Sequence, residues 1–172
     1  WFLAFCTVEG TARWADAILP SAMKYRRACV WVKPDSLPQM NGQGPAPGAE
    51  CFVTAWCGPG HSRWNSGGKR GVYTYPVNPP DRHGKHPTEK PWRLFAELLT
   101  DFTDAGQLVS DPFMGSGTTG VACVKRKIPF IGIEREPKYF DIACSRIESA
   151  SNQPDILIPD NASPTRQDDI FS

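Results

Sequence analysis

The chain has 172 residues with a formal net charge of +1, and 40% of its residues are hydrophobic. This length and composition predict one globular domain with a substantial core, and so small a net charge does not by itself point to any partner. No apolar run approaches the roughly 18 residues of a membrane-spanning helix, so we expect no membrane span.

The N-terminal third predicts strands alternating with a helix. Residues 1–6 favour a strand, 11–23 a helix and 27–32 a second strand, whereas 35–49 are rich in Pro and Gly and predict a loop. A further strand is expected at 50–57. This alternation indicates an α/β sandwich built on a mostly parallel sheet. Because the first residues lack the basic segment and cleavage site of a signal peptide, we interpret the chain as a fragment that begins in a strand.

The six cysteines, at positions 6, 29, 51, 57, 123 and 144, form no C-x-x-C pair. We expect reduced, largely buried thiols in a cytosolic protein, and therefore a cytoplasmic location. Cys51, Cys57 and His61, taken with His83 or His86, match no standard zinc spacing, so we predict no metal site.

Residues 58–85 are basic, with five Lys and Arg against Asp81, a net charge of 5 − 1 = +4. Aromatic residues lie among these cations in a Gly-rich segment, a composition suited to phosphate contacts and base stacking. On composition alone, a solvated loop is the commoner explanation.

The motif HPTEKP, residues 86–91, precedes an amphipathic segment. Pro91 suits the first turn of a helix, and Thr88 is a candidate N-cap. Taken alone, Lys90 would be a solvated surface lysine. The apolar face, which we expect to pack on the sheet, comprises Trp92, Phe95, Leu98, Leu99 and Phe102.

The C-terminal third contains the most informative segment, DPFMGSGTTG at residues 111–120. It joins a predicted strand at 107–110 to a predicted helix at 116–127, and a second strand at 129–133 leads to Glu134. Gly115, Gly117 and Gly120 have the G-x-G-x-x-G spacing of a dinucleotide loop, and Glu134 stands about 20 residues beyond, where an acid would bind ribose.

The residues ahead of these glycines argue against a dinucleotide. A pyrophosphate binds at a helix N-terminus, and Asp111 and Pro112 fit that poorly, because a carboxylate at the strand end repels phosphate. The same carboxylate would attract an ammonium group, which S-adenosylmethionine carries. A P-loop is excluded, since no Lys follows the glycines at the required place. A Gly-rich turn that binds nothing is the structural alternative.

The segment DPFMGSGTTG, followed by FIGIE at 130–134 and PKYFDIACSRIE at 137–148, closely resembles the cofactor half of the amino-group DNA methyltransferases, which act on adenine N6 or cytosine N4. HPTEKP resembles the partner motif that precedes the cofactor motif in the permuted, beta-class members. With WVKP at 31–34, the resemblance covers most of residues 1–149.

The resemblance implies a Rossmann-like methyltransferase fold, a three-layer sandwich that is incomplete in this chain, with the unit around the glycine segment at the centre of its sheet. Residues 1–149 would form the methyltransferase domain, 34–85 a target-recognition insert, and 150–172 a flexible acidic tail. The implied cofactor-binding residues are Asp111, Pro112, Phe113, Gly115, Ser116, Gly117, Thr118, Glu134, His86, Thr88 and Lys90.

The implied cofactor is S-adenosylmethionine, and the implied partner is double-stranded DNA with a flipped target base. We favour adenine N6 as the target because that branch is the commoner, in a bacterial or phage restriction-modification setting. In this context the basic segment is expected to contact DNA, and its candidate DNA-binding residues are Arg63, Trp64, Lys69, Arg70, Arg82 and Lys85.

The family's catalytic tetrapeptide, which is Asp, Asn or Ser followed by Pro-Pro and an aromatic residue, is expected before Trp1 in the permuted order. NPPD at 78–81 ends in Asp81 where an aromatic residue is required, so we interpret it as a turn. We therefore assign no catalytic residue and expect the chain alone to be inactive. The alternative is a non-catalytic remnant that binds S-adenosylmethionine or nucleic acid, with a dehydrogenase as a distant third, and the oligomeric state stays open.

Overall fold

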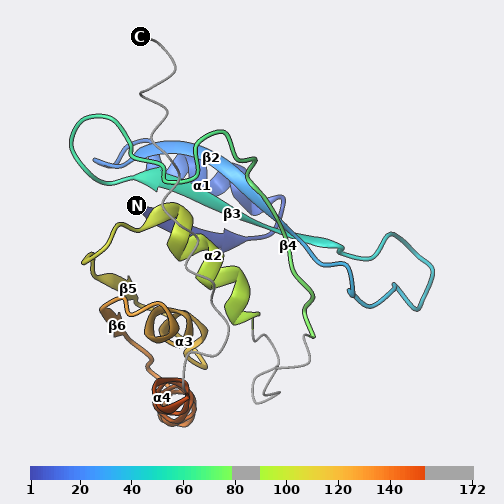
Figure 1. The fold of residues 1–172 in the computed structure, drawn as a ribbon. Helices are drawn as coiled ribbons and strands as arrows, with labels where there is room; N and C mark the ends of the chain where they lie inside the picture. Colours follow the sequence, from blue (N-terminus) through green and yellow to red (C-terminus); the bar gives the residue numbers. More distant parts are fainter. Residues whose placement is uncertain (79–89, 154–172) are drawn as a thin grey trace.

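The computed structural model describes residues 1–78 and 90–153 (Figure 1). Its larger sheet has four strands in the order β1-β3-β2-β4. β1 and β2 both run antiparallel to β3, and β4 runs parallel to β2, so β1, β2 and β4 share one direction. The strands of this sheet are β1 (Phe2–Cys6), β2 (Lys24–Val32), β3 (Ala49–Trp56) and β4 (Val72–Thr74).

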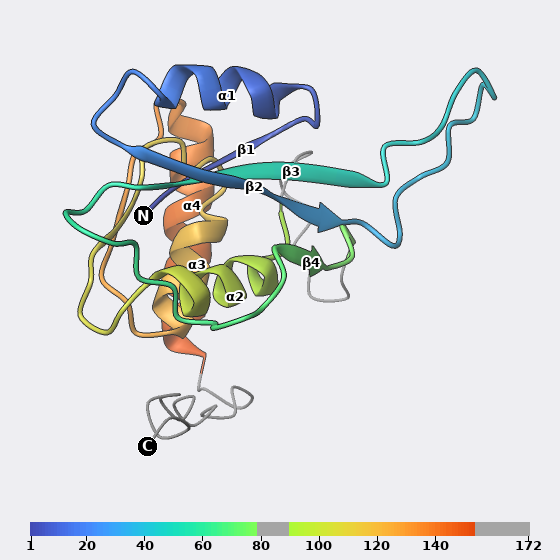
Figure 2. The ribbon, with the colours of Figure 1, turned by 90° about the horizontal axis from the view of Figure 1, so that it is seen from above.

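A second, two-stranded sheet is parallel and joins β5 (Val109–Asp111) to β6 (Phe130–Gly132). Figure 2 shows α1 on one side of the larger sheet and α2 on the other. α2 also packs on α3, which in turn packs on α4. The helices are α1 (Gly10–Ile18), α2 (Trp92–Phe102), α3 (Thr118–Lys125) and α4 (Pro137–Asn152).

β3 forms the centre of the core because it is buried on both of its faces. Phe52 is fully buried and packs with Leu94 and Leu98 of α2, whereas Val53 packs with Ile18 of α1. Burial of a Phe side chain such as that of Phe52 stabilises the fold by about 1.5–3 kcal/mol. The alternation along β3 therefore places one helix on each face of the sheet.

The strand directions differ from the mostly parallel sheet that we predicted. β3 is antiparallel to both of its neighbours, and within residues 1–78 and 90–153 the β5–β6 pair does not join the larger sheet. Apolar periodicity identifies a strand but carries no information about its direction. Since the loop between β2 and β3 contains no helix, it returns the chain as an antiparallel neighbour.

The helix boundaries also correct the prediction. α1 ends at Ile18, shortly before Pro20, rather than at residue 23, and α4 continues to Asn152, into the predicted tail. α2 begins at Trp92, and the residue at its N-cap position is Pro91 in an extended conformation, so Thr88 is not the N-cap. β4 was not predicted, because three residues are too few to show a period.

Candidate functional site

Asp111 stands at the end of β5, and its carboxylate organises the segment that follows. Oδ1 accepts a hydrogen bond of 3.0 Å from the backbone N–H of Phe113, and Oδ2 accepts one of 2.6 Å from the hydroxyl of Thr119. Each carboxylate oxygen can accept a further hydrogen bond. The side chain is therefore held in one orientation while it keeps capacity for a ligand.

Glu134 lies just beyond β6 and binds the same loop from the other strand. Oε2 accepts a 3.0 Å hydrogen bond from the N–H of Gly115, and Oε1 accepts one of 2.9 Å from the N–H of Glu136. The backbone N–H of Glu136, followed by that of Gly115, holds the pKa of Glu134 below its ordinary value. Glu134 is thus ionised at neutral pH, and its carboxylate is held against the backbone of the glycine loop.

The glycine loop is also fixed from below by α4. Gly117 has a φ of 81°, and a Cβ atom there would lie 2.8 Å from the Cβ of Ala143. Arg146 is 7% exposed, and its Nη1 donates hydrogen bonds of 2.5 Å to the carbonyl oxygen and 2.9 Å to the hydroxyl of Ser116. The close approach of α4 at Gly117 requires the absence of a side chain.

The sequence reasoning did not identify Thr119 and Arg146, although the sequence carries a signal for each. Thr119 lies inside the glycine motif itself, eight residues after Asp111. Arg146 falls between Ala143 and Ala150 on the buried face of α4, where a lysine or arginine is unusual unless it is paired.

The surface of the loop combines two carboxylates with one open aromatic ring. Phe113 is 88% exposed and Pro112 is exposed, whereas the side chains of Ser116 and Thr118 are buried. Ser116 and Thr118 therefore shape the loop from within. The two carboxylates are hydrogen-bond acceptors with negative charge. A ligand that carries a cationic group, hydroxyl groups and a flat ring therefore fits this surface better than a phosphate does.

Lys90 lies just before α2, and its side chain contacts the larger sheet. Its Nζ lies 3.0 Å from Oε1 of Glu50 and 5.1 Å from the ring centroid of Phe5. Glu50 also pairs with Lys33 at 2.9 Å, and although burial opposes the shift, the two lysines hold the pKa of Glu50 below its ordinary value. A ligand contact by Lys90 would have to share or break this pair. His86 and Thr88 lie outside the described residues.

The predicted DNA-contact residues have two different environments. Arg63 and Arg70 are exposed, whereas Lys69 pairs with Glu97 at 2.7 Å and with the buried carboxylate of Asp101. Asp101, 2% exposed, also accepts a 2.7 Å hydrogen bond from the hydroxyl of Tyr73. The charge of Lys69 is therefore compensated within the fold, and a contact from Lys69 to DNA would have to share or break these pairs.

Trp64 likewise packs inward. Its ring lies 4.8 Å from that of Phe102, and its Nε1 donates a 2.7 Å hydrogen bond to the carbonyl oxygen of Gly67. The indole of Trp64 is thus held against α2 by a ring contact and a hydrogen bond within the fold. Arg82 and Lys85 lie outside the described residues.

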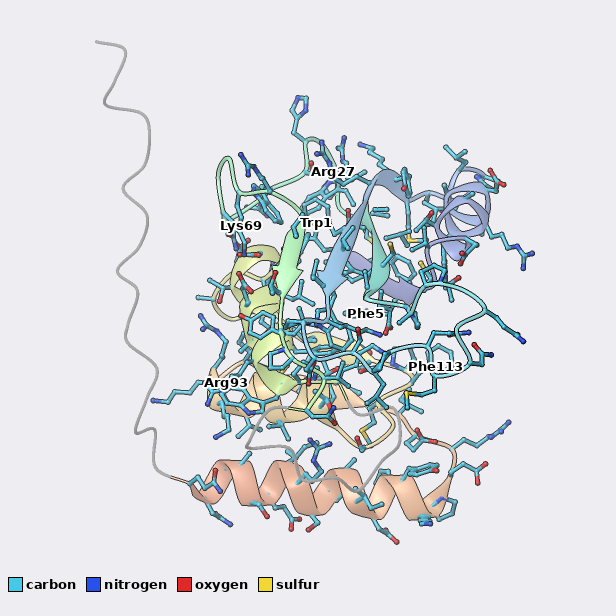
Figure 3. The ribbon with its side chains drawn as sticks, turned by 90° about the vertical axis from the view of Figure 1, so that its right-hand side faces the viewer. Trp1, Phe5, Arg27, Lys69, Arg93 and Phe113 are labelled. Carbon is cyan, nitrogen blue, oxygen red and sulfur yellow. The ribbon has the colours of Figure 1, made fainter. Side chains whose placement is uncertain are left out.

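The loop that carries these residues lies at the far end of α2 from Lys90. Trp1, at the start of β1, donates a 2.7 Å hydrogen bond from Nε1 to the carbonyl oxygen of Arg63, whereas Lys90 stands over Phe5 near the end of the same strand. Figure 3 shows Lys69 and Trp1 well separated from Phe113 of the glycine loop. The structure therefore does not bring the basic loop and the glycine loop together.

All six cysteines are free thiols, of which Cys29, Cys51 and Cys123 are buried and Cys57 is exposed. In the part of the chain that the structure describes, no group of three or more His, Cys, Asp and Glu side chains could hold a metal ion. None of the helices within those residues is long and apolar enough to cross a membrane.

Known proteins with similar sequences are type II methyltransferases. M2.DpnII of Streptococcus pneumoniae is 46% identical over 66 residues, which cover 38% of this chain and 25% of that protein. M.Cfr9I of Citrobacter freundii is 32% identical over 145 residues, 79% of this chain and 48% of that protein. The chain thus spans a quarter to about half the length of these relatives.

The crystal structure of the M1.HpyAVI–SAM complex is similar with a TM-score of 0.75 and 28% identity, over 84% of this chain and 72% of that one. This similarity confirms the predicted α/β, Rossmann-like methyltransferase fold. A family model described as a DNA methylase, for the N6 and N4 enzymes, matches residues 54–145, more than half of the chain. The chain therefore belongs to the N6/N4 family of DNA methylases.

Proposed function

We propose that this chain binds S-adenosylmethionine at residues 111–120 and forms the cofactor-binding part of an enzyme that methylates an exocyclic amino group in double-stranded DNA. Adenine N6 is the favoured target, with cytosine N4 as the other possibility within the family. The observation that carries the proposal is the pair of carboxylates, Asp111 and Glu134, fixed on either side of an open glycine loop.

Each residue around the loop has a role that follows from its environment. The carboxylate of Asp111 holds the ammonium group of the methionine part, and that of Glu134 accepts hydrogen bonds from the ribose hydroxyls. The exposed ring of Phe113 packs against the cofactor, and Gly115 and Gly117 allow the backbone to approach it. When bound, the cofactor supplies an electrophilic methyl group on its sulfonium.

The residues upstream of α2 contribute less directly. Lys90 fixes the start of α2 to β1 and β3 through Phe5 and Glu50, so we assign it a positioning role beside the cofactor. His86 and Thr88 stay candidate cofactor contacts from the sequence motif. The exposed Arg63 and Arg70, with Arg82 and Lys85, are proposed to bind phosphates of the DNA at some distance from the flipped base, in the cytoplasm of a bacterium or an infected cell.

Calorimetry tests the cofactor assignment directly. We expect the chain to bind S-adenosylmethionine and to prefer it over NAD, since Asp111 disfavours a pyrophosphate. Preferential binding of NAD would disprove the assignment. Methylation-sensitive sequencing of DNA from cells that express the complete gene then tests the reaction, and it reports the methylated base and its sequence context together. Cells expressing the gene with Asp111→Asn serve as the matched control, and equal methylation in both would exclude a role for this site.

A further inference from the structure

Cys6 and Cys51 face each other across two neighbouring strands. β1 and β3 run antiparallel, and in their register Cys6, the last residue of β1, is the direct partner of Cys51, near the start of β3. Directly opposed residues of an antiparallel pair have Cα atoms about 4.5 or 5.5 Å apart, and their side chains lie on the same face of the sheet. Both cysteines are free thiols. The fold thus places side by side two thiols that are distant in the sequence.

The pair lies on the face of the larger sheet that α1 covers (Figure 2). Cys6 packs on this face with Ile18 and Val53, and the alternation along β3 places Cys51 on the same face as Val53. α1 begins close to the pair, since a Cβ atom on Gly10 would lie 3.1 Å from the Cβ of Cys6. Cys51 is 5% exposed, whereas Cys6 is half-buried. A small reagent can therefore reach Cys6 more easily than Cys51.

The spacing of the two strands is compatible with a disulfide. A disulfide joins residues whose Cα atoms are about 4.4–6.8 Å apart and whose Cβ atoms are about 3.5–4.5 Å apart. Both Cα spacings of an antiparallel pair fall within this range, whereas the Cβ atoms, at about 4.5–5.5 Å, have to approach each other by about 1 Å. A bond between Cys6 and Cys51 would therefore be slightly strained, and strained disulfides are easily reduced.

We propose that Cys6 and Cys51 form a reversible disulfide when the protein is exposed to a peroxide. The thiolate of Cys6 attacks one oxygen of hydrogen peroxide, the O–O bond breaks and hydroxide leaves, which gives a sulfenic acid on Cys6. The thiolate of Cys51 then attacks Sγ of Cys6, the S–O bond breaks and a second hydroxide leaves. The two thiol protons convert the hydroxides to water. The sulfur atoms thus lose two electrons, and the peroxide oxygens gain them.

The surroundings of the two thiols make this reaction slow at neutral pH. Burial, followed by the neighbouring Cys51 and by Glu50, raises the pKa of Cys6. Burial, followed by Glu9 and Glu50, raises the pKa of Cys51. Because the thiolate is the reactive form, a raised pKa lowers the rate of oxidation at neutral pH, and the rate rises as the pH rises. The pair should therefore respond to sustained exposure to peroxide.

The disulfide would join the two strands that hold Lys90. Phe5 precedes Cys6 and Glu50 precedes Cys51, so both of these side chains lie on the opposite face of the sheet from the thiols. There Nζ of Lys90 lies 3.0 Å from Oε1 of Glu50 and 5.1 Å from the ring centroid of Phe5. The proposed bond is therefore separated from the contacts of Lys90 only by the backbone of β1 and β3.

Mass spectrometry of the full chain tests the proposal. The parent is the Cys57→Ser chain, because the exposed Cys57 otherwise shares a peptide with Cys51. The folded parent is treated with hydrogen peroxide and digested without reduction by trypsin and a Glu-specific protease. We expect residues 1–9 joined to residues 51–63, at a rate that rises about tenfold per pH unit between pH 7 and 8.5. Cys29, buried in β2, is the matched control and should stay a free thiol.

A variant of the same parent shows whether the bond forms within the pair. With Cys51→Ala, the sulfenic acid on Cys6 has no neighbouring thiol, so it should be oxidised further to the sulfinic acid, which dithiothreitol does not reduce. In the parent, dithiothreitol should return both thiols. Absence of the link from the folded parent overturns the proposal. A link from Cys6 to Cys29 overturns it as well, and so does a Cys6 sulfinic acid in the parent while Cys51 stays a free thiol.

Discussion

The hydroxyl of Thr119, in the first turn of α3, donates a 2.6 Å hydrogen bond to Oδ2 of Asp111 at the end of β5. Together with the N–H of Phe113, it fixes the Asp111 carboxylate in a single orientation before any ligand arrives. A cofactor bound as proposed therefore meets an acceptor that has already lost its rotational freedom, which lowers the entropic cost of binding.

Substitution of either partner should weaken cofactor binding to a different extent. Asp111→Asn removes a charge-assisted hydrogen bond worth about 1.5–3 kcal/mol, so affinity for S-adenosylmethionine should fall by about 10- to 150-fold. Thr119→Val removes one neutral donor and should cost about tenfold or less. Titration calorimetry measures both, with Asp141→Asn on the exposed side of α4 as the matched control. Equal affinity of Asp111→Asn and wild type would contradict the assigned role.

The two glycines of the loop should differ in what they tolerate. Gly117→Ala adds a left-handed strain of about 1–2 kcal/mol and also forces a Cβ atom against Ala143, an overpacking that typically costs about 1–3 kcal/mol. Gly115→Ala, at a φ of 53° with nothing within 4 Å, should cost the strain alone. Urea unfolding of the two variants gives both free energies. If Gly115→Ala proves as damaging as Gly117→Ala, the packing of α4 is not the reason for Gly117.

Lys69 and Arg70 are adjacent in sequence and should separate stability from DNA binding. Lys69→Met leaves the carboxylate of Asp101 buried without its cation, so we expect a loss of up to about 3 kcal/mol, at the lower end for buried pairs because Lys69 is partly exposed. Arg70→Met should leave stability unchanged and flatten the salt dependence of DNA binding. Thermal unfolding and a salt titration by fluorescence anisotropy measure these effects. A large salt effect from Lys69→Met in a stable protein would instead favour Lys69 as a DNA contact.

The cysteines should differ in their rate of alkylation according to the burial and the pKa of each thiol. Burial raises the pKa of Cys29 to about 11, and burial followed by the charge of Asp111 raises that of Cys123 to about 12. A raised pKa lowers the thiolate fraction at pH 8, and the thiolate is the reactive form. Iodoacetamide should therefore modify the exposed Cys57 first and leave Cys29 and Cys123 unmodified in the folded protein. Mass spectrometry of peptides reports each site, and unfolding in urea should make the three equally reactive.

The sequence predicted the parts of this protein that depend on local pattern. The residues from Asp111 to Glu134 fix a strand, a turn and a helix, because the glycine spacing and the apolar runs are all within 25 residues of one another. The apolar face of α2 was predicted for the same reason, although Leu94 and Ala96 are buried in it as well.

The parts that were missed depend on contacts between distant segments. No local pattern shows that Lys69 pairs with Asp101, 32 residues away, or that Trp64 packs on Phe102. A cation and an indole in a Gly-rich segment have the composition of a nucleic-acid contact. Only the folded structure shows that both side chains also contact α2. The direction of β3 was missed in the same way, since only its pairing with β1 and β2 defines it.

The length of α2 has a consequence for how DNA would lie on this protein. Its 11 residues span about 16 Å, from Lys90 at one end to the loop of Arg63 and Arg70 at the other. Successive base pairs are about 3.4 Å apart, so this span corresponds to about five base pairs, or half a turn of the double helix. With the target base bound as proposed near the Lys90 end of α2, the phosphate contacts of Arg63 and Arg70 would extend the protected DNA to one side of that base by about this span.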